Sequence, residues 1–574
     1  MATNATSFTA PWITSTFKNA NTTPAILAMV MEKVPIWALL LTAFFGVQII
    51  VVVVNILRQL VLPKDPNLPP EVFHWYPVIG SAIQYGNDPI NFFFQCREKY
   101  GEVFTFVLLG RKVTVALGPK GNDLILGGKP TVVSAEAAYT HLTTPVFGRY
   151  VVYDCPNETL MQQKKFVKFG LSTDNFRAYM GMIEEETMQF ITQDPNFSIY
   201  QKPNSPSTWG TFNAFKKMSE LTILTASRTL QGQEVRSKIT KDFAQLYNDL
   251  DGGFTPLNFM FPSLPLPSYW RRDKAQRQMS EFYQSIIRAR REGGAAHEHE
   301  HDMLAALHTQ TYRDGRALTD VEIAHIMIAL LMAGQHTSSA TSSWTLLHIA
   351  DRPDIQQELY EEQVKFFGIK GQKGKFRPME YEDLKDLPLL DAVIRETLRI
   401  HPPLHSLMRK VLQDLPVPPS LASPSENGAY VIPKGHFVLA SPSVAGMDPN
   451  MWRNPAEWDP HRWIAASNSP NSAPAGKIGG ASAALNDEAT GEKIDYGFGM
   501  VSKGTESPYQ PFGAGRHRCI GETFAYVQLG SIIATLVREM EMRLPSGGFP
   551  QHNYHTMIVV PKNPCDIEYR KRVH

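Results

Sequence analysis

The chain has 574 residues, of which 43% are hydrophobic, so it is long and apolar enough to bury a sizeable core. Its formal charge of +1 creates no field that would collect a polyanion, and no nucleic-acid partner is expected. The four cysteines, Cys96, Cys155, Cys519 and Cys565, form no CxxC pair. This spacing argues against a disulfide framework and a cysteine zinc site, and it favours a reducing compartment for most of the chain.

An uncharged apolar run, residues 34–57, predicts a transmembrane anchor because it exceeds the roughly 20 residues that span a bilayer. A cleaved signal peptide is the alternative, but the run is too long and too far from Met1. Lysines and arginines are nearly balanced on its two sides, so charge encodes the orientation only weakly. Asparagine triplets at Asn4 and Asn21 suit a lumenal tail over residues 1–33.

The body of the chain follows a proline-rich hinge, residues 58–70, which cannot continue a helix. Alternating β-branched and aromatic residues predict a hairpin over 103–117, with its turn at 110–112. Residues 158–310 read as mostly helical, and an Ala-, Ser-, Gly- and Asn-rich stretch predicts a surface insertion at 464–507. The histidine-rich residues 297–301 could bind a transition metal, but a solvated loop is the preferred interpretation.

A long buried helix is predicted from Thr319 to about Ile349, because Thr319 and Glu322 form a capping box before a run that is apolar on nearly every face. Gly334 and the hydroxyls that follow it weaken the helical ladder, which predicts a local bulge or groove. The alternative is that Thr337 and Ser338 merely bond back to carbonyls four residues earlier.

One cysteine, Cys519, lies in a stretch rich in glycine and arginine, residues 511–521, which leads into an apolar helical run over 524–537. A helix N-terminus and the neighbouring Arg516 and Arg518 would lower the pKa of its thiol, and a thiolate there could bind iron. Upstream, a predicted helix over 387–400 carries Glu396 and Arg399 three residues apart, on one face. A surface ion pair is the ordinary interpretation of that spacing.

Together these stretches resemble the cytochrome P450 family. Phe512, Gly515, Cys519 and Gly521 match the family's F-x-x-G-x-R-x-C-x-G loop, with His517 in place of its arginine. The E-x-x-R motif matches at Glu396 and Arg399, which Arg462 would complete. The oxygen-groove motif matches at Ala333, Gly334 and Thr337, with His336 in place of the usual acid. The resemblance implies a mainly α fold with small β-sheets, a haem-thiolate monooxygenase domain over 71–574, and Cys519 as the axial ligand of the haem iron.

The two histidines, with residues 139–148 and 153–157, narrow the resemblance to the sterol 14α-demethylases of filamentous fungi. That resemblance implies three oxidations of the 14α-methyl group of lanosterol or eburicol in ergosterol biosynthesis, with haem b, O2 and NADPH-derived electrons from a cytochrome P450 reductase. It also implies azole binding and an endoplasmic reticulum membrane location with the catalytic domain in the cytosol. The implied catalytic residues are Thr337 and His336, and Glu396, Arg399 and Arg462 would be structural.

The remaining site residues are also carried over from the resemblance. The cofactor would be held by Cys519, Gly513, Phe512 and Gly334, and its propionates would be bound by Tyr139, Tyr153, Lys164, Arg409 and His517. The sterol cavity would be lined by Leu142, Thr143, Phe147, Phe254, Leu407, Met408, Tyr554 and Met557. His336 would relay protons, or else make only a structural hydrogen bond to a neighbouring helix.

Three other functions stay open from the sequence. A divergent paralogue would oxidise another sterol or lipid, and a silent haem protein would bind sterol without turning it over. An anchored structural protein without haem would lack the red-shifted carbon monoxide band that depends on Cys519.

Overall fold

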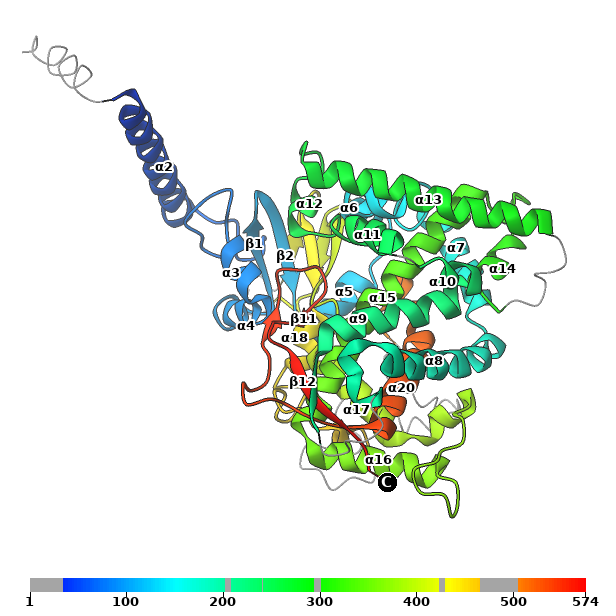
Figure 1. The fold of residues 1–574 in the computed structure, drawn as a ribbon. Coiled ribbons are helices and arrows are strands. Elements are labelled where there is room, and N and C mark those ends of the chain that lie inside the picture. Colours follow the sequence, from blue (N-terminus) through cyan, green and yellow to red (C-terminus); the bar gives the residue numbers. More distant parts are fainter. Residues whose placement is uncertain are drawn as a thin grey trace, which may run out of the picture.

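The computed structural model describes residues 35–201, 208–239, 241–293, 301–422, 429–464 and 504–573 (Figure 1). The predicted tail over 1–33, residues 297–300 of the histidine-rich stretch and residues 465–503 of the predicted insertion lie outside this description. The described chain forms one helical body with small sheets, from which a single helix, α2 (Ile36–Val61), projects.

Helices form most of the body, as predicted. The α-helices are α3 (Ala82–Asn87), α4 (Pro89–Tyr100), α5 (Gly118–Leu126), α6 (Glu136–Phe147), α7 (Asn157–Gly170), α8 (Thr173–Gln193), α9 (Ala214–Ala226), α10 (Gln233–Ser237), α11 (Lys241–Asp251), α12 (Pro256–Met260), α13 (Pro267–Gly293), α14 (Met303–His308), α15 (Asp320–Asp351), α16 (Pro353–Phe367), α17 (Pro388–Ile400), α18 (Pro442–Met447) and α20 (Glu522–Glu539). Shorter helical turns are η1 (Pro195–Tyr200), η2 (Ser227–Gln231), η4 (Tyr381–Asp386), η5 (Pro460–Trp463) and η6 (Gly515–His517).

The strands gather into small sheets. They are β1 (Val103–Leu108), β2 (Arg111–Ala116), β3 (Val133–Ser134), β4 (Gly210–Asn213), β5 (Leu407–Val411), β6 (Leu415–Val417), β7 (Tyr430–Ile432), β8 (Phe437–Ala440), β9 (Met540–Arg543), β10 (His552–Asn553), β11 (Val560–Pro561) and β12 (Asp566–Lys571). The largest sheet has the order β1-β2-β8-β5-β3, and a second has the order β4-β12-β9. β10 pairs with β11, and β6 pairs with β7.

The predicted hairpin over 103–117 is present, but its turn is not at 110–112. Leu109 and Gly110 form the turn, with φ of 47° and 79°, and Arg111 already pairs with Leu108. Two successive positive φ angles are typical of the tight turns whose twist matches that of paired strands. The turn is therefore shorter than predicted and includes one residue of the first apolar run.

Helix α15 crosses the centre of the body and packs against α9, α13, α17 and α20 (Figure 1). Its N-terminus has the predicted capping box, in which the Thr319 hydroxyl accepts from the Glu322 N–H and the Glu322 carboxylate accepts from the Thr319 N–H. The predicted bulge is wrong, because the helix is continuous through Gly334. The Thr337 hydroxyl instead donates to the Ala333 carbonyl at 2.8 Å, as in the alternative interpretation.

Helix α2 is apolar and exposed along its length, with Trp37–Val61 long enough to cross a bilayer. It continues to Val61, four residues past the predicted end of the apolar run, so an extended segment begins only at Leu62. Near its C-terminal end, the Asn55 side chain is buried and donates to the carbonyls of His74 and Trp75 at 2.8 and 3.1 Å. These contacts attach the helix to the body.

Candidate functional site

The Cys519 loop turns sharply before α20. Gly513 and Gly515 both have positive φ, and a Cβ atom at Gly515 would lie 2.2 Å from the Leu126 carbonyl oxygen. Glycine is therefore required at Gly515 both for the turn and for the close approach of α5. The Cys519 N–H donates to the Phe512 carbonyl at 3.0 Å, and the Gly521 N–H donates to the sulfur. The loop thus presents the thiol just before the first turn of α20.

The Cys519 side chain is exposed, yet surrounding protein raises the pKa of its thiol by desolvation. Both findings hold if the sulfur lies among protein groups and faces an accessible space. Arg518 lowers this pKa as predicted, and so does the Gly521 N–H at the helix N-terminus, but burial outweighs both and the net pKa of the thiol is raised. Arg518 forms an ion pair with Glu522 at 2.6 Å, and Glu522 itself raises the pKa of the thiol.

The five residues predicted to hold the haem propionates come together beside this loop. The rings of Tyr139 and Tyr153 stack with centroids 5.5 Å apart, and the ring of His517 lies 5.8 Å from that of Tyr153. The buried Arg409 interacts electrostatically with all three of these side chains. The Lys164 ammonium donates to the carbonyls of Arg516 and Arg518 at 2.9 and 2.7 Å. These donors come from α6, α7, β5 and two loops.

The electrostatics of this cluster favour an anionic ligand. Burial and the neighbouring Arg409 lower the pKa of His517 to about 4, and burial lowers the pKa of Lys164. Glu136, 3.8 Å from His517, is the acid that faces the histidine among the described residues. The positive charges of Arg409 and Lys164, which oppose a proton on His517, would stabilise carboxylates placed here. The donor set together with an accessible cysteine thiol therefore fits a haem and its two propionates.

A second accessible surface lies on α15, which is otherwise almost wholly buried. Ala333 is exposed and Leu330, Gly334 and Thr337 are half-buried, and this spacing places all four on one face of the helix. A Cβ atom at Gly334 would meet only Leu230, at 3.5 Å, so this position is not required to be glycine by packing. The small side chains of this face leave room for a ligand.

His336 points to a neighbouring helix. Its Nε2 atom lies 3.0 Å from an Asp251 carboxylate oxygen and 2.9 Å from the Tyr247 hydroxyl, both on α11. Tyr247 also donates to the side-chain carbonyl of Gln335 at 2.7 Å. The structural hydrogen bond considered for His336 is therefore present. Because the Asp251 side chain is 47% exposed, the same contact also joins His336 to solvent.

The predicted sterol contacts fall into neighbouring apolar clusters. Phe254 packs on Phe147 with ring centroids 5.3 Å apart and lies against both large hydrophobic clusters of the body. Leu142, Met408 and Met557 belong to or pack on the smaller of these clusters. Thr143 is buried and donates to the Tyr139 carbonyl. Leu407 approaches Gly513, and Tyr554 meets His405 edge to face at 5.9 Å.

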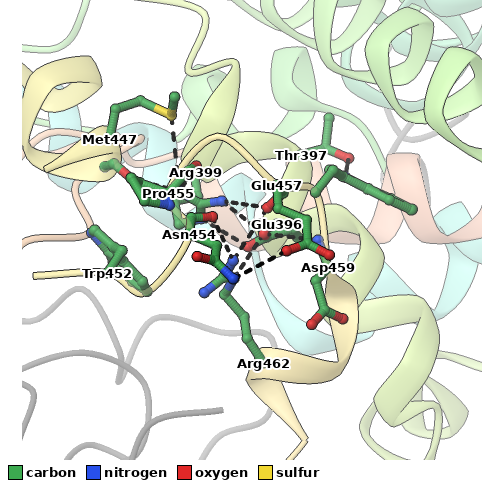
Figure 2. Close-up of polar contacts among 12 residues, drawn as sticks. Glu396, Thr397, Arg399, Met447, Trp452, Asn454, Pro455, Glu457, Asp459 and Arg462 are labelled. Atoms are coloured by element: carbon green, nitrogen blue, oxygen red, sulfur yellow. Dashed lines mark hydrogen bonds and ion pairs between the residues drawn. The ribbon is translucent and has the colours of Figure 1, made fainter. Parts of the chain in front are cut away.

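Glu396 and Arg399, whose contacts Figure 2 shows, do not form a surface pair, because both side chains are fully buried. One Glu396 oxygen accepts from Arg399 and Arg462 at 2.8 Å and from the Asp459 N–H at 3.1 Å. The other accepts from Arg399 at 2.9 Å and from the Trp463 indole at 2.8 Å. Arg399 also donates to the carbonyls of Gly446 and Pro455, both at 2.7 Å. The network joins α17 to the segment that precedes the Cys519 loop.

Sequence reasoning missed several partners in the site. Asp251 and Tyr247 contact His336, Glu136 faces His517, and Trp463 and Asp459 complete the Glu396 network. No local pattern distinguishes Asp251 from Asp249 two residues earlier. Asp459 and Trp463, in contrast, flank Arg462 in the sequence and could have been included with it.

Comparison with known proteins agrees with this geometry. The chain is 54% identical over 543 residues to the lanosterol 14-alpha demethylase of Mycosarcoma maydis, covering 92% of this chain and 93% of that protein. It is 47% identical over 539 residues to the eburicol 14-alpha-demethylase of Uncinula necator, covering 93% and 96%. The fold matches retinoic acid bound cyanobacterial CYP120A1 with a TM-score of 0.67 at 18% identity, covering 89% of this chain and all of that one. The cytochrome P450 family model matches residues 70–569. The near full-length family match agrees with the cysteine loop and with the buried Glu-Arg-Arg network. This chain therefore belongs to the cytochrome P450 family.

Proposed function

We propose that this protein is a sterol 14α-demethylase that removes the 14α-methyl group of lanosterol or eburicol in three oxidations, on the pathway to ergosterol. The observation that carries the proposal is the 54% identity to a lanosterol 14-alpha demethylase over nearly the whole of both chains. The apolar clusters beside the Cys519 loop and α15 support it, because a sterol needs a long, mostly hydrophobic site with few polar groups.

Cys519 would bind the iron of haem b through its sulfur, and Lys164, Arg409, His517, Tyr139 and Tyr153 would hold the haem propionates by hydrogen bonds and charge. Phe512, Gly513 and Gly334 leave space for the flat macrocycle. The bound haem supplies the activation of O2 with electrons from NADPH. The residues of the chain bind and orient the two substrates and move protons to them.

His336 relays protons from solvent. Its Nε2 atom exchanges a proton with the half-exposed Asp251 carboxylate at 3.0 Å, and His336 directly precedes Thr337 on α15. The Thr337 hydroxyl donates to the Ala333 carbonyl, so its oxygen can still accept a hydrogen bond at the accessible face of α15. An imidazole here replaces the acid that other members of the family carry.

The sterol lies among Leu142, Thr143, Phe147, Phe254, Leu407, Met408, Tyr554 and Met557. Phe147 and Phe254 present aromatic faces from α6 and the loop before α12, and Leu407 with Met408 brings the start of β5 to the same region. Azole inhibitors would use this apolar lining together with a nitrogen that binds the haem iron.

The membrane attachment is a single anchor, α2, with the body on the cytosolic side of the endoplasmic reticulum. Exposed apolar side chains near the anchor support this placement: Trp75, Val78 and Ile83 follow α2, and Leu257, Phe261, Leu264 and Trp270 surround α12. The two groups meet at the β1–β2 turn, because the Gly110 N–H donates to the Val78 carbonyl and Arg111 donates to the Phe259 carbonyl. One side of the body can therefore rest on the bilayer.

The electron donor is an NADPH-cytochrome P450 reductase. A cavity of about 430 Å³ between α7 and residues 310–313 has basic side chains, Lys165, Arg313 and Arg516, along its lining, with the apolar Phe169. Arg516 connects this surface directly to the Cys519 loop. The lining also contains Glu158, which pairs with Arg313 at 3.5 Å, so three cations face one acid and the net positive charge suits an acidic partner.

The test is expression of the full chain in a fungal strain that lacks its own sterol 14α-demethylase. Restored growth with accumulation of 14-demethylated sterols is expected for the wild type, and none for Cys519→Ser. Purified protein with reductase, NADPH and lanosterol or eburicol should give formate and the demethylated sterol. Haem-loaded protein that shows the red-shifted carbon monoxide band but yields neither product would reject the proposal. Oxidation of another lipid by that protein would assign the divergent function instead.

A further inference from the structure

Three histidines form a hydrogen-bonded chain away from the residues of the proposed catalytic face. The Nε2 atoms of His348, on α15, and His401, which follows α17, lie 2.7 Å apart. The Nδ1 atom of His401 lies 2.7 Å from the Nε2 atom of His552, on β10. The His401 ring stacks on Trp344 with centroids 4.0 Å apart, and the His348 ring stacks on Trp458 at 4.7 Å. The chain therefore joins three elements that are distant in the sequence.

The three rings are uncharged at neutral pH. A neutral imidazole has one N–H group, so the three rings supply three donors. Each of the two contacts needs only one donor, and both can therefore form without a positively charged ring. Burial, together with the neighbouring His552, lowers the pKa of His348 and His401 well below its usual value, and burial lowers that of His552 to about 4.

The charged groups around the chain agree with this assignment. Arg352 and Arg399 face the two buried rings and oppose a further positive charge, while Asp88, before α4, faces His552. Among the described residues no group of three or more His, Cys, Asp or Glu side chains is arranged to hold a metal ion. The rings therefore interact by hydrogen bonding and stacking, not by coordination.

The chain ends at a hairpin formed by β10 and β11. The ring of Tyr554 stacks on His552 with centroids 5.4 Å apart, and Met557 follows on the same hairpin. The Val559 N–H donates to the Pro403 carbonyl at 2.9 Å, and the Val559 carbonyl accepts from the Trp344 indole at 3.3 Å. The hairpin thus attaches to α15 and to the segment after α17 at His552 and at Val559, on either side of Tyr554 and Met557.

We propose that His401 and His552 are positioning residues for sterol binding, which hold this hairpin so that Tyr554 and Met557 meet the sterol. This rests on the proposed function, because only a sterol site gives these two side chains a ligand. Between the two attachments, His555 and Thr556 are exposed and Tyr554 and Met557 are only half-buried. Loss of the His401–His552 hydrogen bond should therefore loosen the hairpin without unfolding the body.

The test compares four forms of the full-length holoprotein: wild type, His552→Phe, His552→Gln and His555→Phe. Phenylalanine at 552 keeps an aromatic ring beside Tyr554 but removes the hydrogen bond to His401. Glutamine reaches the same nitrogen with its side-chain amide and restores a hydrogen bond. His555 lies on the same hairpin, but its side chain is exposed, so His555→Phe is the matched control.

Sterol affinity is measured from the absorbance change of the haem on titration with lanosterol. His552→Phe should bind the sterol about fivefold more weakly, the factor that corresponds to one net hydrogen bond. His552→Gln and His555→Phe should bind as the wild type does. Turnover at saturating sterol and the carbon monoxide band should be unchanged in all four, since positioning acts on binding and not on the thiolate.

Equal affinity in His552→Phe and His555→Phe, or no recovery in His552→Gln, would overturn the inference. A carbon monoxide band lost in His552→Phe would also overturn it, since the chain would then support the fold as a whole. Failure of the proposed function would look different, because the wild type itself would then show no absorbance change with sterol.

Discussion

Replacing Glu396 with glutamine tests whether the buried charge network supports the Cys519 loop. The Glu396 carboxylate is fully buried and accepts five hydrogen bonds, from Arg399 twice and once each from Arg462, Trp463 and the Asp459 N–H. Glutamine has nearly the same shape, but one of its two terminal atoms becomes an NH2 group. At least two of the five groups that donate to Glu396 would then face the new NH2 group, which is itself a donor. Both guanidinium groups would also lose their counterion (Figure 2).

The expected loss of stability follows from this geometry. Each lost hydrogen bond to a charged group costs about 1.5 to 3 kcal/mol, and two such losses give about 3 to 6 kcal/mol. Removal of one partner from a buried ion pair independently gives about 3 to 5 kcal/mol. Since a domain is stable by only about 5 to 15 kcal/mol, Glu396→Gln should lose a large part of its stability and unfold at a much lower urea concentration than the wild type.

The assay is urea unfolding of the holoprotein, followed by circular dichroism and by the carbon monoxide band. Glu71→Gln is the control, because Glu71 forms an exposed pair with Lys112 at 3.0 Å and such pairs contribute at most about 1 kcal/mol. A Glu396→Gln protein as stable as Glu71→Gln would refute the reasoning.

Three further outcomes are expected. Burial raises the pKa of Glu362 from 4.5 to about 7, so between these pH values the folded chain holds a proton that the unfolded chain has released. The free energy of unfolding should therefore fall by about 3 kcal/mol as pH rises across that window. Urea unfolding should show this fall in the wild type and not in Glu362→Gln. Asp251→Asn, which removes the carboxylate beside His336, should slow demethylation about tenfold at unchanged sterol affinity, whereas Asp249→Asn should not. Asn55→Ala, which removes two hydrogen bonds to the His74 and Trp75 carbonyls, should make residues 62–70 more sensitive to protease, with Thr42→Ala on exposed helix surface as the control.

The sequence alone predicted the features that depend on local patterns. The capping box at Thr319 and the apolar run behind it predicted α15 almost to its ends, and the residues from Leu387 onward predicted α17. Both helices depend on contacts between residues a few positions apart, which a pattern records directly. The bulge predicted at Gly334 was wrong: α15 is continuous there and packs against α9, α13, α17 and α20, although its own composition would weaken it.

Long-range contacts could not be predicted in the same way. The spacing of Glu396 and Arg399 says that they share a helix face, but only the fold reveals that this face is buried against residues 446–463. The same holds for His336, whose partners Asp251 and Tyr247 lie on a helix about 90 residues earlier in the sequence. Pairings across such separations depend on how the helices pack, so the sequence supplies the candidates and the fold selects among them.

The Cys519 loop shows why charges that are close in the sequence do not by themselves predict the pKa of a thiol. Arg518 is adjacent in the sequence and lowers the pKa of the thiol, but Glu522, which pairs with Arg518 at 2.6 Å, raises it. Lys164 lowers the pKa of the thiol, yet its ammonium is bonded to the carbonyls of Arg516 and Arg518. Desolvation is the largest effect on the sulfur, and it favours the neutral thiol. Burial therefore outweighs the nearby positive charges at the sulfur, so the sequence positions of Arg518 and Lys164 alone do not give the direction in which the pKa of the thiol is shifted.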